Sequence, residues 1–244
     1  IRIHGRPPAS VVFCLDVSGS MECDVAPGEP TKISIAKKSL IGLLPRLRND
    51  DEIAVITFTE EAKVVIPLTR ADSLDHSVVS SKIDSLIAAG GTDLSCGYKL
   101  AASILEGRVG KERELRIMFM TDMCPNAGEF SGEGLFAIAE RCAKKQIFST
   151  FLGIGLDFDT ALVDRVTCGI RGSSYESIKS ATSFEKRMLR DFDYTVFPIL
   201  FDVSVRIESS GWAISGAYGS PEATKSQGGH GGGGGGGRGV ELMK

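Results

Sequence analysis

Apolar residues alternate along the chain between short continuous runs and longer amphipathic stretches. Continuous apolar runs predict buried strands, whereas apolar residues spaced three or four apart predict helices. The predicted strands are 11–15, 53–58, 64–68 at an edge, 115–120, 147–154 and a weaker 174–178. The predicted helices are 33–47, 74–87, 94–105, 135–142, 161–166 and 184–192.

The alternation of buried strands with helices predicts the fold class. A strand that is apolar on both faces must be covered on both faces, as in a parallel sheet between two helix layers. We therefore expect an α/β domain over residues 9–193, with a doubly wound, mostly parallel sheet and helices on both faces. Residues 1–8 form an N-terminal lead-in.

The pattern changes after residue 193. Apolar and polar residues alternate over 201–207, which is typical of a half-exposed antiparallel strand, and 211–218 is a candidate for its partner. Residues 194–222 are thus expected to be a short C-terminal β extension, part of an incomplete second unit. Ten of the 29 glycines lie between Gly228 and Gly239, so 223–239 is interpreted as a Gly-rich linker and 240–244 as the start of a further strand.

Composition excludes several functions. The net charge is −3 without a basic run, so no nucleic-acid partner is expected, and no apolar stretch approaches the roughly 20 residues that span a membrane. A hydrophobic fraction of 42% suffices for a core. The chain has six cysteines but neither a disulfide framework nor an Asn-x-Ser/Thr sequon, which favours an intracellular or unglycosylated setting. The compartment itself stays open.

Oxygen-bearing side chains gather where the predicted strands end. Ligands of such a sheet bind outside the carboxyl ends of its strands. The first strand runs into Asp16, Ser18 and Ser20, the strand 115–120 runs into Asp122, and Thr92 follows a Gly-Gly turn before a helix. All five are hard oxygen donors, which suit Mg²⁺ or Mn²⁺ rather than zinc or copper.

The same five residues resemble the metal-ion-dependent adhesion site of von Willebrand factor A (VWA) domains. The pattern is Asp16-x-Ser18-x-Ser20, then Thr92, then Asp122, and the flanking residues 12–15, 90–93 and 121 match as well. The resemblance implies a non-catalytic adhesion or recruitment module whose bound metal accepts an Asp or Glu carboxylate from a partner protein. It also implies that partner binding alters the docking of 182–222, because family members couple the site to their last helix.

Neighbouring residues extend or qualify this site. Asp24 and Asp93 are accessory candidates near the metal, although Cys23 interrupts the acidic pair that a second cation site would use. Cys23, Cys96 and Cys124 each fall in one of the site loops, where we expect them to be small loop-lining residues; redox-sensitive or soft-metal thiols are the alternative. Taken alone, Asp16 could cap a helix, Ser18 or Ser20 could be a loop hydroxyl, and Thr92 could be an N-cap after the Gly-Gly turn.

Two alternative functions remain. A Mg²⁺-dependent phosphotransferase of the haloacid-dehalogenase type also begins with an Asp after its first strand, but its second Asp would stand where this chain has Ser18. A VWA domain that holds no metal and serves only as structure is the other. The tail is similar to those of bacterial multidomain VWA proteins, inter-alpha-trypsin inhibitor heavy chains and plant RING-type ligases, which implies a fragment of a larger protein.

Overall fold

The computed structural model describes most of the first 155 residues and selected segments beyond them. The described residues are 6–122, 132–155, 169–170, 172–178, 182, 192–193 and 195–197, and three strands within 204–243. The chain divides into two compact units, Ile1–Pro198 and Ile199–Lys244. Each unit is considered by itself.

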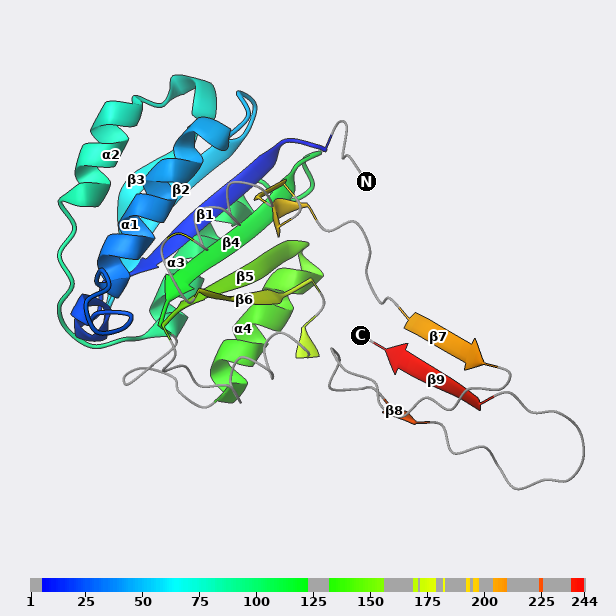
Figure 1. Ribbon diagram of the computed structural model, residues 1–244. Helices are drawn as coiled ribbons and strands as arrows, with labels where there is room; N and C mark the ends of the chain where they lie inside the picture. The colour runs from blue at the N-terminus through cyan, green and yellow to red at the C-terminus, as the bar shows by residue number, and fades with distance from the viewer. Residues whose placement is uncertain are drawn as a thin grey trace, which may run out of the picture. The chain divides into compact units, whose positions relative to one another are not determined.

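A six-stranded sheet forms the centre of the first unit, in the order β3-β2-β1-β4-β5-β6 (Figure 1). Its strands are β1 (Ala9–Asp16), β2 (Glu52–Phe58), β3 (Ala62–Arg70), β4 (Glu114–Thr121), β5 (Ile147–Ile154) and β6 (Ser174–Ile178). Every neighbouring pair is parallel except β2 with β3, which is antiparallel. The predicted doubly wound, mostly parallel sheet is confirmed.

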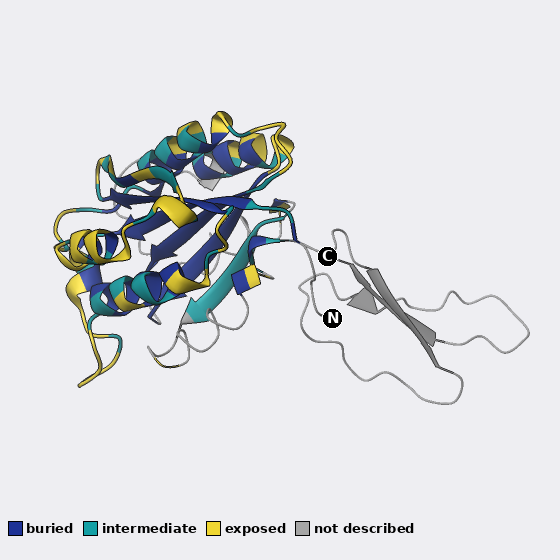
Figure 2. Cartoon of the chain, turned by 90° about the horizontal axis from the view of Figure 1, so that it is seen from above, coloured by how far each residue is buried: buried dark blue, intermediate teal, exposed yellow. Residues whose placement is uncertain are grey.

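Helices cover both faces of this sheet. The helices α1 (Lys32–Leu43) and α2 (His76–Asp84) pack with Val11, Phe13 and Leu15 of β1 in one apolar cluster. The helices α3 (Leu94–Glu106) and α4 (Gly132–Lys144) pack with Val12 and Cys14 in the other. Successive side chains of a strand point to opposite faces, and both faces are covered here, so β1 is buried along its whole length. Figure 2 shows the inner strands of the sheet in the colour of buried residues.

The edge strand β3 shows the opposite pattern. Most of its residues are exposed or half-buried, Pro67 lies within it, and its pairing with β2 is interrupted by register shifts. Proline cannot donate to a ladder, so it is confined to edges and bulges of sheets. The predicted edge position of 64–68 is therefore confirmed.

Two predicted helices are shorter than their apolar patterns. The helix predicted over 33–47 ends at Leu43 and continues as the 3-10 turn η2 (Leu44–Arg46), because Pro45 cannot continue an α-helix. The helix predicted over 74–87 is α2, which begins after Asp75 and stops at Asp84. Two further 3-10 turns are η1 (Gly19–Glu22) and η3 (Ala71–Ser73). The predicted helix 161–166, and most of 184–192, lie outside the described residues.

The second unit contains a three-stranded antiparallel sheet in the order β7-β9-β8. Its strands are β7 (Ser204–Ser209), β8 (Thr224–Lys225) and β9 (Arg238–Met243). The partner of β7 is thus β9, while the candidate return strand 211–218 lies outside the described residues. The stretch interpreted as a linker, 223–239, includes β8 and the first two residues of β9, because ladder pairing uses backbone groups that glycine also carries.

Candidate metal-binding site

Asp16 ends β1 with a buried carboxylate that accepts two hydrogen bonds. Its Oδ1 accepts from the backbone N–H of Ser18 at 2.9 Å, and its Oδ2 accepts from the Thr121 hydroxyl at 2.6 Å. The first bond folds the loop back over the end of β1, and the second joins β1 to the end of β4. The carboxylate is therefore held in one orientation at the carboxyl edge of the sheet.

Burial dominates the electrostatics of Asp16. It raises the pKa of the carboxyl group to about 6, because a charged carboxylate loses its hydration inside the protein. Hydrogen bonds from Ser18 and Thr121 act against this shift, whereas the nearby charge of Asp122 adds to it. A cation bound here would replace the lost hydration and favour the ionised form.

Ser18 and Ser20 present neighbouring hydroxyl groups, with their Oγ atoms 3.2 Å apart. Gly19 between them donates its N–H to the carbonyl of Gly90 at 3.0 Å, and Ala89 donates to the carbonyl of Val17 at 2.8 Å. A Cβ on Gly19 would lie 3.4 Å from that Gly90 oxygen. The serine loop and the Gly-Gly turn are therefore joined through their backbones.

Thr92 is buried just beyond this turn, which Gly90 enters with a φ of +85°. The next residue, Asp93, donates its N–H to the carbonyl of Thr59 at 2.7 Å and caps α3 through its side chain. Its Oδ1 accepts from the N–H of Ser95 at 2.8 Å and from the Ser95 hydroxyl at 2.7 Å. The backbone on either side of Thr92 is therefore fixed, by the hydrogen bond from Gly19 to Gly90 before it and by the cap of α3 at Asp93 after it.

Asp122 follows β4 and is buried with Lys32. The Lys32 Nζ donates to Asp122 Oδ2 at 3.0 Å, and the two side chains are 6% and 0% exposed. The sequence did not predict Lys32 at this site, and it indicated Thr121 only as a flanking residue, without its hydrogen bond to Asp16. One signal for Lys32 exists: it is the first residue of α1, where the helix dipole disfavours a cation.

The five candidate ligands would offer two carboxylates and three hydroxyl groups. Hydrogen bonds connect the loops that carry them, and four of the five side chains are buried. Within the described part of the chain, no group of three or more His, Cys, Asp or Glu side chains is placed to hold a metal ion. Hydroxyl and carboxylate oxygens are the donor types that a hard cation such as Mg²⁺ or Mn²⁺ prefers.

The accessory candidates lie differently. Asp24 is exposed, and its backbone forms an isolated bridge with Thr31. Cys23 is exposed, whereas Cys96 is half-buried and directs its thiol to the carbonyl of Asp93 at 3.1 Å. Burial raises the pKa of the Cys96 thiol to about 11, so it stays protonated at neutral pH. Cys124 lies outside the described residues.

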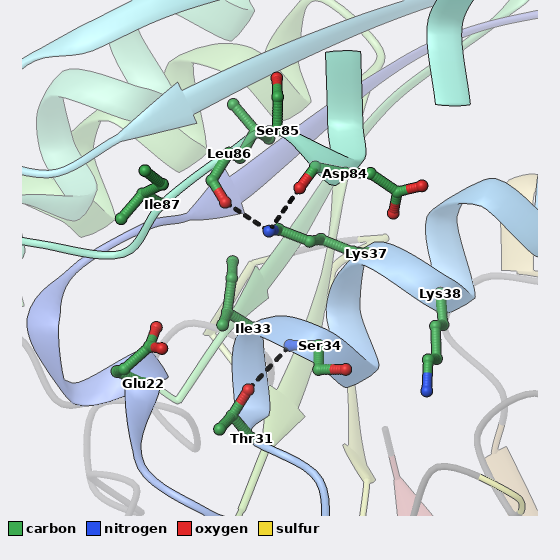
Figure 3. Close-up of a pocket in the computed structure, with 10 residues that line it drawn as sticks. All are labelled: Glu22, Thr31, Ile33, Ser34, Lys37, Lys38, Asp84, Ser85, Leu86 and Ile87. Carbon is green, nitrogen blue, oxygen red and sulfur yellow. Dashed lines mark hydrogen bonds between the residues drawn. The ribbon is translucent and has the colours of Figure 1, made fainter. Parts of the chain in front are cut away.

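A polar pocket of about 450 Å³ lies beside the serine loop, between η1, α1 and the end of α2 (Figure 3). Its lining includes Glu22, two residues after Ser20, and Ile33 of α1. Lys37 reaches across it and donates to the carbonyl oxygens of Asp84 and Leu86 (Figure 3). None of the five candidate ligands lines this pocket, which the sequence did not predict.

The sequence is similar to a known domain family and to several known proteins. Residues 11–125 match the family model described as von Willebrand factor type A domain. The uncharacterized protein YfbK of Escherichia coli (strain K12) is 24% identical over 204 residues, covering 83% of this chain and 34% of YfbK. The uncharacterized protein sll0103 of Synechocystis sp. is 30% identical over 176 residues, covering 69% of this chain and 37% of that protein.

Inter-alpha-trypsin inhibitor heavy chain H4 of Bos taurus is also similar. It is 26% identical over 188 residues, covering 73% of this chain and 20% of the heavy chain. The chain therefore spans between a fifth and two fifths of the lengths of these three relatives.

Solved structures support the same fold. A von Willebrand factor type A protein from Catenulispora acidiphila superposes with a TM-score of 0.67 at 20% identity, covering 82% of this chain and 45% of that one. The manganese-loaded TRAP protein of Plasmodium vivax gives a TM-score of 0.56 at 19% identity, covering 74% and 72%. The family model and the solved structures together support a VWA domain in the first unit. In the described part of the chain, no helix has the length and apolar character to cross a membrane.

Proposed function

We propose, starting from the VWA domain that these comparisons support, that the first unit is a cation-dependent protein-binding module. Asp16, Ser18, Ser20, Thr92 and Asp122 would hold one Mg²⁺ or Mn²⁺ ion. The observation that carries the proposal is the Asp16 carboxylate, which is buried and bonded to both Ser18 and Thr121 at the carboxyl edge of the sheet. The manganese in the similar TRAP protein supports the choice of a divalent cation.

The donor set accounts for the proposed binding of a partner. A bound divalent cation would supply a Lewis-acidic position that takes an anionic oxygen. Ser18, Ser20 and Thr92 contribute neutral oxygens, so only two of the five ligands carry negative charge. The ligands therefore do not exceed the charge of a divalent ion, and a coordination position left open on that ion can take a further carboxylate, which we assign to an Asp or Glu side chain of a partner protein.

Binding is favoured over catalysis by the position two residues after Asp16. A phosphotransferase of the haloacid-dehalogenase type would need a carboxylic acid there to move a proton. The residue is Ser18, whose hydroxyl lies 3.2 Å from that of Ser20. A hydroxyl in this environment is a weak proton carrier at neutral pH, so we assign the domain no catalytic step.

Selection from a random-peptide phage library tests this function without a known partner. The full chain is immobilised in MnCl2, the library is applied, and bound phage are released with EDTA. We expect the released peptides to be enriched in Asp or Glu at one position. The exposed Glu60 provides a matched control: Glu60→Ala should select the same peptides, whereas Asp16→Ala should select none. Equal EDTA-released enrichment on wild type and Asp16→Ala would contradict the proposal.

A further inference from the structure

A buried ammonium group lies at the candidate metal site. Lys32 is 4% exposed, and its Nζ lies 3.0 Å from Oδ2 of Asp122. A buried charge is costly unless it is paired, and the ion pair gives each of these two side chains a partner. One oxygen of a proposed metal ligand is thus engaged by a cation that belongs to the protein.

The backbone fixes where this lysine begins. Thr31 caps α1 by accepting a hydrogen bond from the N–H of Ser34 at 3.3 Å. Lys32 itself donates its N–H to the carbonyl of Cys23 at 3.0 Å, which ties the start of α1 to the residue after η1. The lysine therefore starts from a fixed point next to the serine loop.

The end of β5 fixes the path of its side chain. Gly155 follows β5 with a φ of +106°, and a Cβ there would lie 3.0 Å from Cε and 3.5 Å from Nζ of Lys32. The absence of a side chain at this position leaves room for the lysine. Lys32 thus joins three parts of the site edge: the start of α1, Asp122 after β4, and Gly155 after β5.

We propose that Lys32 is a positioning residue that sets the charge of the metal site and so makes it select a carboxylate ligand. The inference rests on the proposed function. Asp16 and Asp122 together would cancel the charge of a divalent ion, leaving a neutral site. The Lys32 ammonium adds one positive charge, so the loaded site attracts an anion.

A charge-setting role of Lys32 lowers the affinity of the site for the metal, whereas a purely structural role does not. A fixed positive charge repels the incoming metal and competes with it for Asp122, so Lys32 weakens metal binding while it strengthens carboxylate binding. If Lys32 only braced the fold, its removal would loosen Asp122 and weaken metal binding. The two roles therefore predict opposite changes in metal affinity.

Calorimetric titration of Mn²⁺ into the full chain distinguishes these roles. The variants are Lys32→Met, which keeps much of the length but loses the charge, and Lys32→Gln, which keeps a polar end. Lys38→Met is the matched control, because Lys38 is exposed on the same helix and its loss changes the net charge equally. Thermal unfolding with and without Mn²⁺ is measured alongside.

We expect both Lys32 variants to bind Mn²⁺ about tenfold more tightly than wild type or Lys38→Met, since the repulsion is lost. We also expect a larger rise in Tm on adding Mn²⁺ to the Lys32 variants than to wild type. Acetate, as a carboxylate probe of the Mn²⁺-loaded proteins, should bind more weakly to both variants. Unchanged or weaker Mn²⁺ binding in folded Lys32 variants would overturn the inference while leaving the proposed function intact. No Mn²⁺ binding by wild type would instead overturn the proposed function.

Discussion

The Thr121 hydroxyl donates a 2.6 Å hydrogen bond to Oδ2 of Asp16, although 105 residues separate them in the chain. The bond joins the ends of two neighbouring parallel strands, β1 and β4, at the edge where the candidate ligands gather. Thr121 is not a proposed ligand. It fixes the orientation of a carboxylate that is one.

Replacing Thr121 by valine should therefore affect both the fold and the site. Valine has nearly the same shape but no hydroxyl, so buried Asp16 loses a donor. We expect Thr121→Val to lower the free energy of unfolding by about 1–3 kcal/mol in urea and to weaken Mn²⁺ binding. Thr121→Ser keeps the hydroxyl donor and should retain most of the free energy of unfolding and of the Mn²⁺ affinity. Wild-type Mn²⁺ affinity in Thr121→Val would show that the bond does not position Asp16.

Variants of Asp93, which caps α3, give a second test. They show whether Asp93 affects Mn²⁺ binding by placing Thr92 or through its own charge. Asp93→Ala should lower stability by about 1 kcal/mol and weaken Mn²⁺ binding, since the cap that follows Thr92 is lost. Asp93→Asn, which can cap the helix without a charge, should restore both the stability and the Mn²⁺ affinity. Asp75 caps α2 away from the candidate ligands, so Asp75→Ala should lower stability alone. If Asp93→Asn bound Mn²⁺ as poorly as Asp93→Ala, Asp93 would be acting through its charge.

Gly155 should tolerate a side chain poorly. Its φ of +106° disfavours any residue with a Cβ, and that Cβ would crowd Lys32. We expect Gly155→Ala to lower the free energy of unfolding by about 1–3 kcal/mol. Gly110 has a φ of +77° but open space around it, so Gly110→Ala isolates the cost of backbone strain. A loss at Gly155 no larger than that at Gly110 would show that crowding of Lys32 costs nothing.

Acid stability should depend on Asp51, which is buried with Arg6. Burial raises the pKa of Asp51, but hydrogen bonds from Arg6 and from the N–H groups of Arg48 and Ala9 outweigh it, so the pKa is lowered overall. A carboxyl group whose pKa is lower in the folded state contributes stability above its unfolded pKa of about 3.9 and loses it as the pH falls below that value.

The measurement is urea unfolding of wild type and Asp51→Asn from pH 7 to pH 3. Breaking this buried pair should lower the free energy of unfolding by about 3–5 kcal/mol at pH 7. The difference in that free energy between wild type and Asp51→Asn should shrink below about pH 4. Asp50→Asn removes an equal charge from the preceding residue, whose half-exposed carboxylate forms only a 3.9 Å ion pair with Arg48, and it should cost little stability at any pH. A difference between wild type and Asp51→Asn that stays constant down to pH 3 would contradict this reading of the pair.

Sequence patterns predicted the sheet well because burial on both faces leaves a local trace. The run of apolar residues in β1 and the exposed, proline-bearing β3 each follow from the position that the strand takes in the sheet. The ends of the helices were harder to place. A pattern of apolar residues continues past Leu43, whereas the helix stops where Pro45 approaches.

The part of the site that sequence reasoning missed depends on contacts between distant residues. Lys32 pairs with Asp122 across 90 residues, and nothing near Lys32 in the chain names that partner. The partner of β7 is similarly remote, because β9 lies beyond the glycine-rich stretch. Local patterns predict which strand ends meet at an edge, but they do not predict which side chain reaches across it.

Calorimetric titration of Mn²⁺ into the wild-type chain and into Asp16→Ala tests the central claim most directly. We predict one metal ion bound per wild-type chain, removed by EDTA, and no binding by Asp16→Ala, with circular dichroism showing that both are folded. An absence of metal-dependent heat in the folded wild-type chain, or equal heat from the two proteins, would contradict a metal site built on Asp16.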